Sequence, residues 1–357
     1  MYDGSQSSRP DRYLLIQNAM MILPDRVVEG DLRARMKVYY DGKYGRVVSS
    51  SEILEIAPGG GLTPYQGSRL GRETVIDGDG LHLLPGAIDP QVHFREPGQP
   101  EKEDIASGSR AAAAGGVTAF LDMPNNKPAV ITRSRMAEKK ARAAEQCVVH
   151  YGFFMGATPD NLEELSAVEN VCGIKVFMGA STGDLLVDDP VALERIFANG
   201  TRLIAVHAED ETVMRDNQAL LGEVQDIRAH PRIRDESAAL RATKLATRLS
   251  LKHQRRLHVL HLTTEEECDL LRTLPAGHRI SAEVCPQHFT LTAPECYDRL
   301  GTRAQMNPPL RTQRHADALW AALKDGTLQC IATDHAPHTL EEKDQPYGKA
   351  PSGMPGV

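Results

Sequence analysis

The feature that most constrains the fold is a long alternation of short apolar runs with helix-like segments, which begins near residue 81. Each apolar run has the length of one buried strand, and the segments between the runs are long enough for helices. Residues 137–145, for example, are rich in Ala, Lys and Glu, as an outer helix would be. Strands and helices that alternate in this way form parallel sheets, and eight strands close a barrel. The predicted fold is therefore an α/β protein with a (β/α)₈ TIM-type barrel over residues 81–357, whose strands are 83–88, 117–123, 148–155, 173–177, 203–207, 257–261, 279–284 and 328–333.

The chain before the barrel has a different texture. Residues 13–80 contain short strand-like runs separated by Gly and Pro, which predicts a small N-terminal β domain. Residues 1–12 are polar and are predicted to be a disordered tail. No closing helix follows the eighth predicted strand before Val357, so the C-terminal part of the barrel is expected to be missing.

Composition excludes several classes of function. The net charge of −7 argues against a nucleic-acid surface. No apolar run reaches the ~18 residues of a membrane span. The six cysteines form no C-x-x-C pair, which favours free, mostly buried thiols in a reducing cytoplasm.

Polar residues at the predicted strand ends are the candidates for chemistry, because catalytic groups of barrels collect there. The first strand leads into Gln91 and His93, which point the same way because they are two residues apart. A metal enzyme would normally have His at both positions, and here the first is Gln91. His93, His207, His261 and Asp334 are together predicted to be metal ligands. The alternatives are core histidines for His207 and His261 and a helix N-cap for Asp334.

Lys175 and the remaining histidines allow more than one interpretation. Lys175 lies between apolar neighbours, where a cation is costly to bury. It is either snorkelling or ion-paired, or carbamylated by CO₂ to an anionic group that could bridge two metals. His258 lies three residues before His261, an offset that would turn its side chain to the opposite face of the strand, and it is given no role. The remaining histidines that lie outside the strand-end pattern are predicted to be structural or solvated: His150, His230, His253 and His315.

Four motifs resemble the amidohydrolase superfamily, specifically dihydroorotases and their cyclic-amidase relatives, over about residues 13–357. They are His93-Phe94-Arg95-Glu96-Pro97-Gly98, Met123-Pro124-Asn125, Asp334-His335-Ala336-Pro337-His338 and Ser352-Gly353-Met354-Pro355-Gly356. The resemblance implies one or two Zn²⁺ ions bridged by carboxylated Lys175, with Gln91 as a weak or absent ligand. It implies that Asp334 is both metal ligand and proton shuttle, and that Asn307 contacts the substrate ring. It also implies that Arg95, Asn125 and His338 hold a substrate carboxylate.

The implied activity is the reversible interconversion of dihydroorotate and N-carbamoyl-L-aspartate in pyrimidine biosynthesis. Arg95 favours this substrate over neutral rings, because a guanidinium matches the geometry of a carboxylate. The alternative interpretation of Arg95 is a surface salt bridge. An allantoinase- or hydantoinase-like activity is the runner-up. The rival from another class is a non-catalytic scaffold with a transcarbamoylase partner, and the family also implies a homodimer. Gln91 leaves three outcomes open: two metals with the first weakened, one metal with catalysis, or no catalysis.

Overall fold

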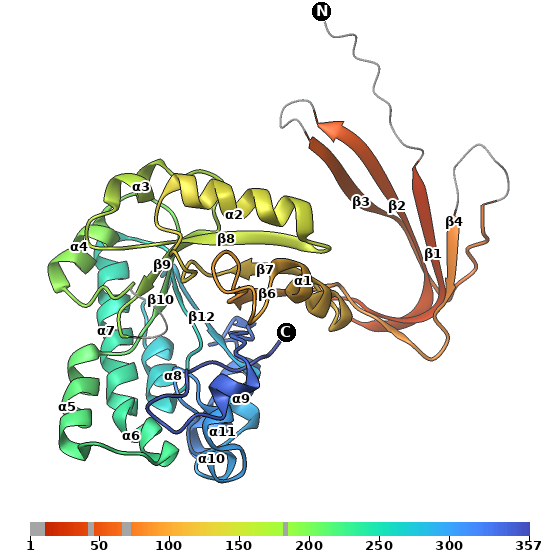
Figure 1. The fold of residues 1–357 in the computed structure, drawn as a ribbon. Coiled ribbons are helices and arrows are strands. Elements are labelled where there is room, and N and C mark those ends of the chain that lie inside the picture. Colours follow the sequence, from red (N-terminus) through yellow and green to blue (C-terminus); the bar gives the residue numbers. More distant parts are fainter. Residues whose placement is uncertain (1–10, 42–45, 66–72, 181–184) are drawn as a thin grey trace, which may run out of the picture. The chain divides into compact units, whose positions relative to one another are not determined.

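The computed structural model describes residues 11–41, 46–65, 73–180 and 185–357, without the side chains of residues 38–49 (Figure 1). Two compact units are present, Met1–Gly86 and Ala87–Val357. Most of the predicted tail, residues 1–12, lies outside the described residues, and Arg12 is already the first residue of a strand. The predicted domain boundary at residues 80 and 81 stays a prediction.

The N-terminal unit is one small sheet. Its strands are β1 (Arg12–Ile22), β2 (Val27–Asp41), β3 (Arg46–Pro58), β4 (Glu73–Asp77) and β5 (His82–Leu83). The order is β3-β2-β1-β4, and β5 pairs with the far end of β1. Alternate residues of β1, among them Tyr13 and Leu15, are buried, as the period of two requires. The prediction of a small β unit before the barrel is confirmed.

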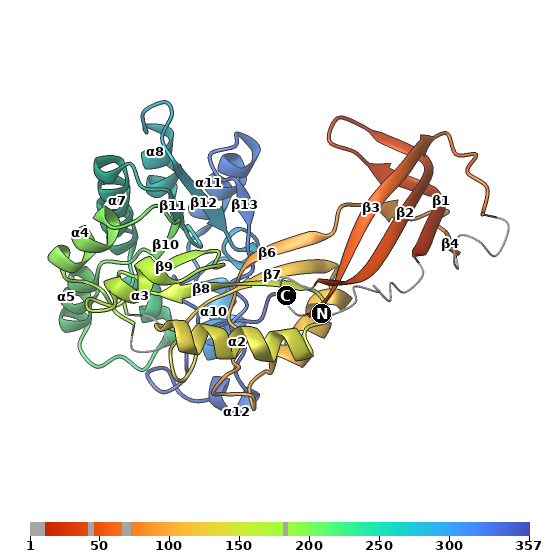
Figure 2. The ribbon, with the colours of Figure 1, turned by 90° about the horizontal axis from the view of Figure 1, so that it is seen from above.

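The C-terminal unit contains eight parallel strands in sequence order (Figure 2). A parallel bridge between Val92 and His335, with the His93 amide donating to the His335 carbonyl at 2.7 Å, joins the first strand to the segment after the last. The predicted (β/α)₈ barrel is confirmed. Its strands are β6 (Ala87–Val92), β7 (Val117–Asp122), β8 (His150–Gly156), β9 (Gly173–Phe177), β10 (Ile204–His207), β11 (Leu257–Val259), β12 (Ile280–Val284) and β13 (Cys330–Ile331).

The boundaries of the first and last barrel strands were predicted wrongly. The first barrel strand begins at Ala87 and not at residue 83, because His82 and Leu83 pair with β1 in the N-terminal sheet. The apolar side chains of Leu84 and Ile88 are exposed, so this run looked like a buried strand without being one. The last strand is also shorter than predicted. Beyond it, the amide and hydroxyl of Thr333 bond to the carboxylate of Asp89 instead of to a neighbouring strand.

Helices cover the outside of the barrel. Outward residues of the strands, such as Ile174 and Val206, share one apolar core with helix residues such as Ile196 and Leu249. Full burial of each such side chain contributes roughly 1.5–3 kcal/mol. The helices are α1 (Ile105–Ala114), α2 (Arg133–Gln146), α3 (Leu162–Ala167), α4 (Pro190–Ala198), α5 (Glu211–Leu221), α6 (His230–Ile233), α7 (Glu236–His253), α8 (Glu265–Arg272), α9 (Pro286–Thr290), α10 (Glu295–Leu300), α11 (Gln313–Lys324) and α12 (Leu340–Lys343), with short 3₁₀ turns at Ile227–Ala229 and Gly301–Ala304.

Two expectations from composition can be compared with the structure. All six cysteines are free thiols, as predicted, but only Cys268, Cys285 and Cys296 are buried, so half and not most of them are. Among the described residues, no helix combines the length and the apolar character that a membrane crossing needs.

Candidate metal and substrate site

A small cavity of about 20 Å³ lies at the C-terminal ends of the barrel strands. The structure brings together in its wall every predicted metal-binding residue, including Gln91, and the predicted ring-contacting Asn307. The lining residues are Gln91, His93, Lys175, Phe177, His207, His261, Asn307, Asp334, Ala336, Ser352 and Gly353. Arg95, Asn125 and His338 are not among them.

The orientation of His207 suits a metal ligand. Its Nε2 lies 2.9 Å from a carboxylate oxygen of Glu209, which can only accept, so Nε2 carries the proton and Nδ1 presents a lone pair. That Nδ1 lies 3.0 Å from Nε2 of His261. Burial would raise the pKa of Glu209, but Arg234 and His207 outweigh it and hold the pKa well below its usual range. Burial lowers the pKa of both histidines, which are therefore neutral, as metal ligands must be.

Two of the predicted ligands have an unusual backbone conformation. His261 has φ 37° and Asp334 has φ 48°, both in the left-handed region. Such conformations cost about 1–3 kcal/mol each and gather at functional sites. No helix starts at Asp334, so its alternative role as an N-cap is excluded. The left-handed turn at each position directs the side chain into the cavity just beyond the end of its strand.

The side chains around Asp334 come from the C-terminal ends of the first two barrel strands, whereas Asp334 itself follows the last strand. The amide Nε2 of Gln91 donates to Oδ1 of Asp334 at 2.8 Å, and Nε2 of His93 lies 2.8 Å from the same oxygen. Nδ1 of His93 lies 2.6 Å from Oδ1 of Asn125, an acceptor. With its single ring proton on Nδ1, His93 turns the lone pair of Nε2 toward a carboxylate oxygen. Two acceptors that face each other need a cation or a proton between them.

Lys175 is fully buried on β9, and its Nζ has no hydrogen-bond partner among the described residues. The ring centre of Phe177 lies 4.5 Å from Nζ. Burial lowers the pKa of the ammonium to about 7, although Asp334 and Glu283 oppose the shift. An ion pair or a snorkelling side chain, the ordinary alternatives for Lys175, is not what this geometry shows.

The wall of the cavity fits a bound cation. Four buried polar atoms of lining residues lack a hydrogen-bond partner in the described part of the chain: Gln91 Oε1, Lys175 Nζ, His261 Nδ1 and Asn307 Oδ1. Imidazole and carboxylate groups are the ligands that zinc prefers. The residues present therefore suit one or two metal ions.

Arg95 and His338 lie together beside the cavity. Nε of Arg95 donates to the carbonyl of Pro337 at 2.9 Å, and its Nη2 lies 3.1 Å from Nε2 of His338. Gly353 separates His338 from the cavity. Its φ is 146°, and a Cβ there would lie 2.5 Å from the Ala336 carbonyl oxygen and 3.0 Å from the His338 ring. Arg95 is buried, which rules out the alternative of a surface salt bridge.

Two histidines without a predicted catalytic role hold the loop that carries Asn307. Nε2 of His230 donates to the Met306 carbonyl at 2.9 Å, and Nε2 of His288 donates to the Pro308 carbonyl at 3.0 Å. His230 is thus structural, as predicted, but lies next to the site. Glu209 and Arg234 were missed as well. The position of Glu209, two residues after a ligand histidine, is the signal that could have identified it.

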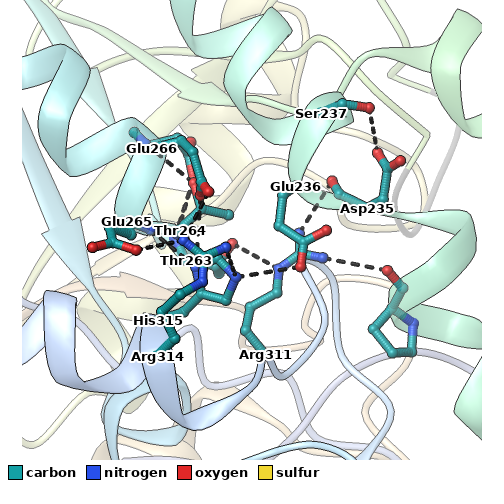
Figure 3. A network of polar contacts seen from close by, with 12 residues as sticks. Asp235, Glu236, Ser237, Thr263, Thr264, Glu265, Glu266, Arg311, Arg314 and His315 are labelled. Atoms are coloured by element: carbon teal, nitrogen blue, oxygen red, sulfur yellow. Dashed lines mark hydrogen bonds and ion pairs between the residues drawn. The ribbon is translucent and has the colours of Figure 1, made fainter.

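A polar network around the buried side chain of Arg311 joins loops next to the site (Figure 3). Nε of Arg311 donates to the hydroxyl of Thr263 at 3.3 Å, and its terminal nitrogens donate to the carbonyls of Arg234 and Asp235. Arg311 therefore joins the segments that carry Asn307, His261 and Arg234.

The predicted orientation of His258 was wrong. The strand ends at Val259 and His261 is left-handed, so the offset of three residues does not turn the two side chains apart. Nε2 of His258 lies 2.9 Å from Oε2 of Glu283, whose other oxygen accepts the amide of His261. The ligand atoms of His258, Glu283 and Cys330 lie within 4.8 Å of one another. Burial would lower the pKa of His258, but Cys330 and Glu283 raise it to about 10, so it forms a buried ion pair.

Comparison with known proteins agrees with this geometry. The model of the amidohydrolase family matches residues 82–354. The dihydroorotase of Halobacterium salinarum is 36% identical over 319 residues, which cover 87% of this chain and 73% of the relative. Those of Methanosarcina acetivorans and Lactococcus lactis are 36% and 34% identical, covering 80% and 88% of this chain. The chain spans 63% and 76%, respectively, of the length of these two relatives.

Solved structures share the fold. The L-hydantoinase (dihydropyrimidinase) from Arthrobacter aurescens has a TM-score of 0.81 at 24% identity, covering 95% of this chain and 73% of that one. The dihydropyrimidinase from Brevibacillus agri NCHU1002 has a TM-score of 0.77 at 27% identity, covering 96% and 74%. The chain therefore belongs to the amidohydrolase family, in which curated proteins named dihydroorotase are among its relatives.

Proposed function

We propose that the chain is a zinc-dependent dihydroorotase that interconverts dihydroorotate and N-carbamoyl-L-aspartate in de novo pyrimidine biosynthesis. Its family and its relatives make it a hydrolase that acts on cyclic amides. The observation that carries the finer proposal is the buried Arg95–His338 pair beside a cavity lined with metal-ligand side chains. A guanidinium at that place provides for the carboxylate that distinguishes dihydroorotate from neutral rings.

The metal-binding residues divide into two groups. His207, His261 and Lys175 would hold one ion, and His93, Asp334 and Lys175, with Gln91 as a weak ligand or none, would hold the other. Bound zinc would lower the pKa of a water and polarise the ring carbonyl. Carboxylation of Lys175 requires the neutral amine as nucleophile, and a pKa of about 7 leaves a large neutral fraction at physiological pH.

The chain's own residues would carry the proton and orient the ring. Asp334 would accept the proton of the attacking water and return it to the leaving ring nitrogen. Arg95 and His338, with Asn125, would hold the carboxylate, while Asn307 would contact the ring. The contact of Asn125 with His93 gives Asn125 a second task, which is to orient a metal ligand.

A hydantoinase-like activity is the second candidate, and the dihydropyrimidinase from Brevibacillus agri favours it through its similar fold. A ring without a carboxylate would not need Arg95. Relative turnover of dihydroorotate and dihydrouracil separates the two activities, and loss of dihydroorotate turnover in an Arg95→Met variant would support the lead proposal.

The expectations about location and partners remain proposals. The six free thiols are compatible with a cytoplasmic enzyme. A homodimer and a transcarbamoylase partner rest on the family alone. A non-catalytic scaffold would contain no metal and would not turn over dihydroorotate.

The deciding experiment measures zinc by plasma mass spectrometry on the purified chain together with ring opening of dihydroorotate by its ultraviolet absorbance. One to two zinc ions per chain with turnover would support the proposal. A folded chain without metal and without turnover would overturn it and leave the scaffold.

A further inference from the structure

Lys102 is a nearly buried cation on the loop between β6 and α1, with 9% of its side chain exposed. Its Nζ lies 3.2 Å from Nδ1 of His338 and 2.8 Å from Oε1 of Glu342. Glu342 is itself fixed, because it forms a capping box with Thr339 at the start of α12. The ammonium of Lys102 is therefore held in place against one nitrogen of the His338 ring.

This contact selects one tautomer of His338. Burial and the cations Arg95 and Lys102 lower the pKa of His338 to about 3, so the ring is neutral at physiological pH. An ammonium group can only donate, so Nδ1 must accept from Lys102 and Nε2 must carry the proton. Nε2 then donates to the carbonyl of Ser352 at 3.1 Å.

The same tautomer decides what Arg95 can bind. Nη2 of Arg95 lies 3.1 Å from Nε2 of His338, but a guanidinium has no acceptor and Nε2 carries a proton. No hydrogen bond can form between the two, so the Nη2 protons are directed to another acceptor. In the other tautomer, Nδ1 would donate to Glu342, 3.5 Å away, and Nε2 would accept from Arg95.

The groups that face His338 together favour a bound anion. They are the cations Arg95, Lys102 and Lys343 and the anion Glu342. Lys343 also fixes the backbone opposite His338, because its Nζ donates to the carbonyls of Gln305, Pro351 and Gly353 at 2.9–3.0 Å. The cluster therefore carries an excess of positive charge, while the Nη2 protons of Arg95 stay free for an acceptor.

We propose that Lys102 is a positioning residue that locks His338 in the Nε2–H tautomer and thereby keeps Arg95 available for a substrate carboxylate. The inference rests on the proposed function for the identity of that carboxylate. The tautomer itself can be measured without substrate.

The first test is the ¹⁵N nuclear magnetic resonance spectrum of the histidine-labelled chain, with the His338 signals assigned from a His338→Gln variant. The wild type should show a protonated Nε2 and an unprotonated Nδ1, and Lys102→Met should reverse this pattern. A protonated Nδ1 in the wild type would overturn the inference, whatever becomes of the variants.

The second test is kinetic, with dihydroorotate as substrate. Lys102→Met should raise KM by about ten- to a hundredfold, the effect of one lost charge-assisted hydrogen bond, with a much smaller change in kcat. Lys102→Arg keeps a donor and should restore most of the affinity. Lys324→Met, which removes an exposed lysine of α11, should leave both constants unchanged.

The outcomes separate the two proposals. A wild type that binds zinc but does not open dihydroorotate would refute the proposed function and leave the tautomer test standing. An active wild type whose KM is unaffected by Lys102→Met would refute the role of Lys102 and leave the proposed function standing.

Discussion

At the scale of single residues, Gln91 distinguishes this site from one with two histidines on the first strand. Its Nε2 donates to Asp334, the attractive arrangement for an amide beside a carboxylate, and its Oε1 is left without a hydrogen-bond partner among the described residues. An amide oxygen is a weaker zinc ligand than imidazole. The site next to His93 and Asp334 should therefore hold its metal less tightly than the site of His207 and His261.

Replacing Gln91 by His should fill the weaker site. We expect zinc in the Gln91→His variant to rise from about one toward about two per chain at limiting metal, because an imidazole supplies the missing ligand. Plasma mass spectrometry after dialysis measures this. Gln313→His, which adds an exposed histidine on α11, is the matched control. Equal zinc content in the Gln91→His variant and the wild type would show that Gln91 does not limit metal binding.

Lys175 illustrates a conflict between stability and function. A Lys175→Met variant should no longer bind metal. Its free energy of unfolding should nevertheless exceed that of the metal-free wild type by about 1–3 kcal/mol, because a buried amine without a hydrogen-bond partner is removed. The folded pKa of about 7 lies below the unfolded value near 10.4, so the unfolded wild type binds more protons between these pH values. The unfolding free energy of the metal-free wild type should therefore rise from pH 7 to pH 10 relative to that of the variant. Parallel pH profiles from urea titrations would contradict this prediction.

At the scale of elements, α2 supports the site from outside the barrel. Lys139 of this helix is fully buried, and its Nζ lies 2.9 Å from Asp122 and donates to the Met123 carbonyl and to Oδ1 of Asn126. Asn126 in turn donates to the carbonyls of Phe94 and Glu96. One lysine therefore joins α2 to the ends of β6 and β7, between which His93 and Asn125 meet.

Removing this lysine should be costly. Lys139→Met leaves the carboxylate of Asp122 buried without its cation, which should lower the unfolding free energy by about 3–5 kcal/mol. Lys140→Met, at the neighbouring half-buried position where Nζ donates to the Glu169 carbonyl, should lower it by less than about 1 kcal/mol. Urea unfolding followed by circular dichroism measures both. A similar loss in the two variants would mean that the buried pair contributes no more than a surface contact.

At the scale of the whole molecule, the barrel is closed with little backbone pairing. β13 has two residues, and its connection to β6 includes the bridge between Val92 and His335 and the hydrogen bonds that the amide and hydroxyl of Thr333 donate to Asp89. Gln91, His93 and Asp334 lie on the two sides of this junction. The geometry of the proposed metal site formed by His93 and Asp334 therefore depends on how the first and last strands are joined.

Loss of the Asp89 carboxylate should open this junction. We expect Asp89→Ala to lower the unfolding free energy by about 2–4 kcal/mol, because the amide of Thr333 loses its buried acceptor. Amide hydrogen exchange should increase around residues 87–93 and 330–335 while the helices on the far side stay protected. Asp160→Ala, at an exposed position, is the control. Uniform loss of protection across the barrel would argue against a local role in closure.

The architecture and most of the ligand set could be predicted from the sequence, because both rest on local patterns. Alternating apolar runs and helical segments define eight parallel strands, and parallel strands bring their ends to one rim. His93, His207, His261 and Asp334 therefore had to meet once the strands were recognised. The apolar run before Ala87 was misread because composition cannot tell which of two sheets a strand will join.

Only the tertiary structure decided the protonation states and the hydrogen-bond partners of these groups. Gln91 meets Asp334 across 243 residues of sequence, and Lys102 meets His338 across 236. The tautomers of His207 and His338, the burial of Lys139 and the inward position of His258 depend on such distant contacts. Local propensity carries no information about them, because a proton's position on an imidazole, or a lysine's pKa, is determined by whichever charges the folded chain places around it.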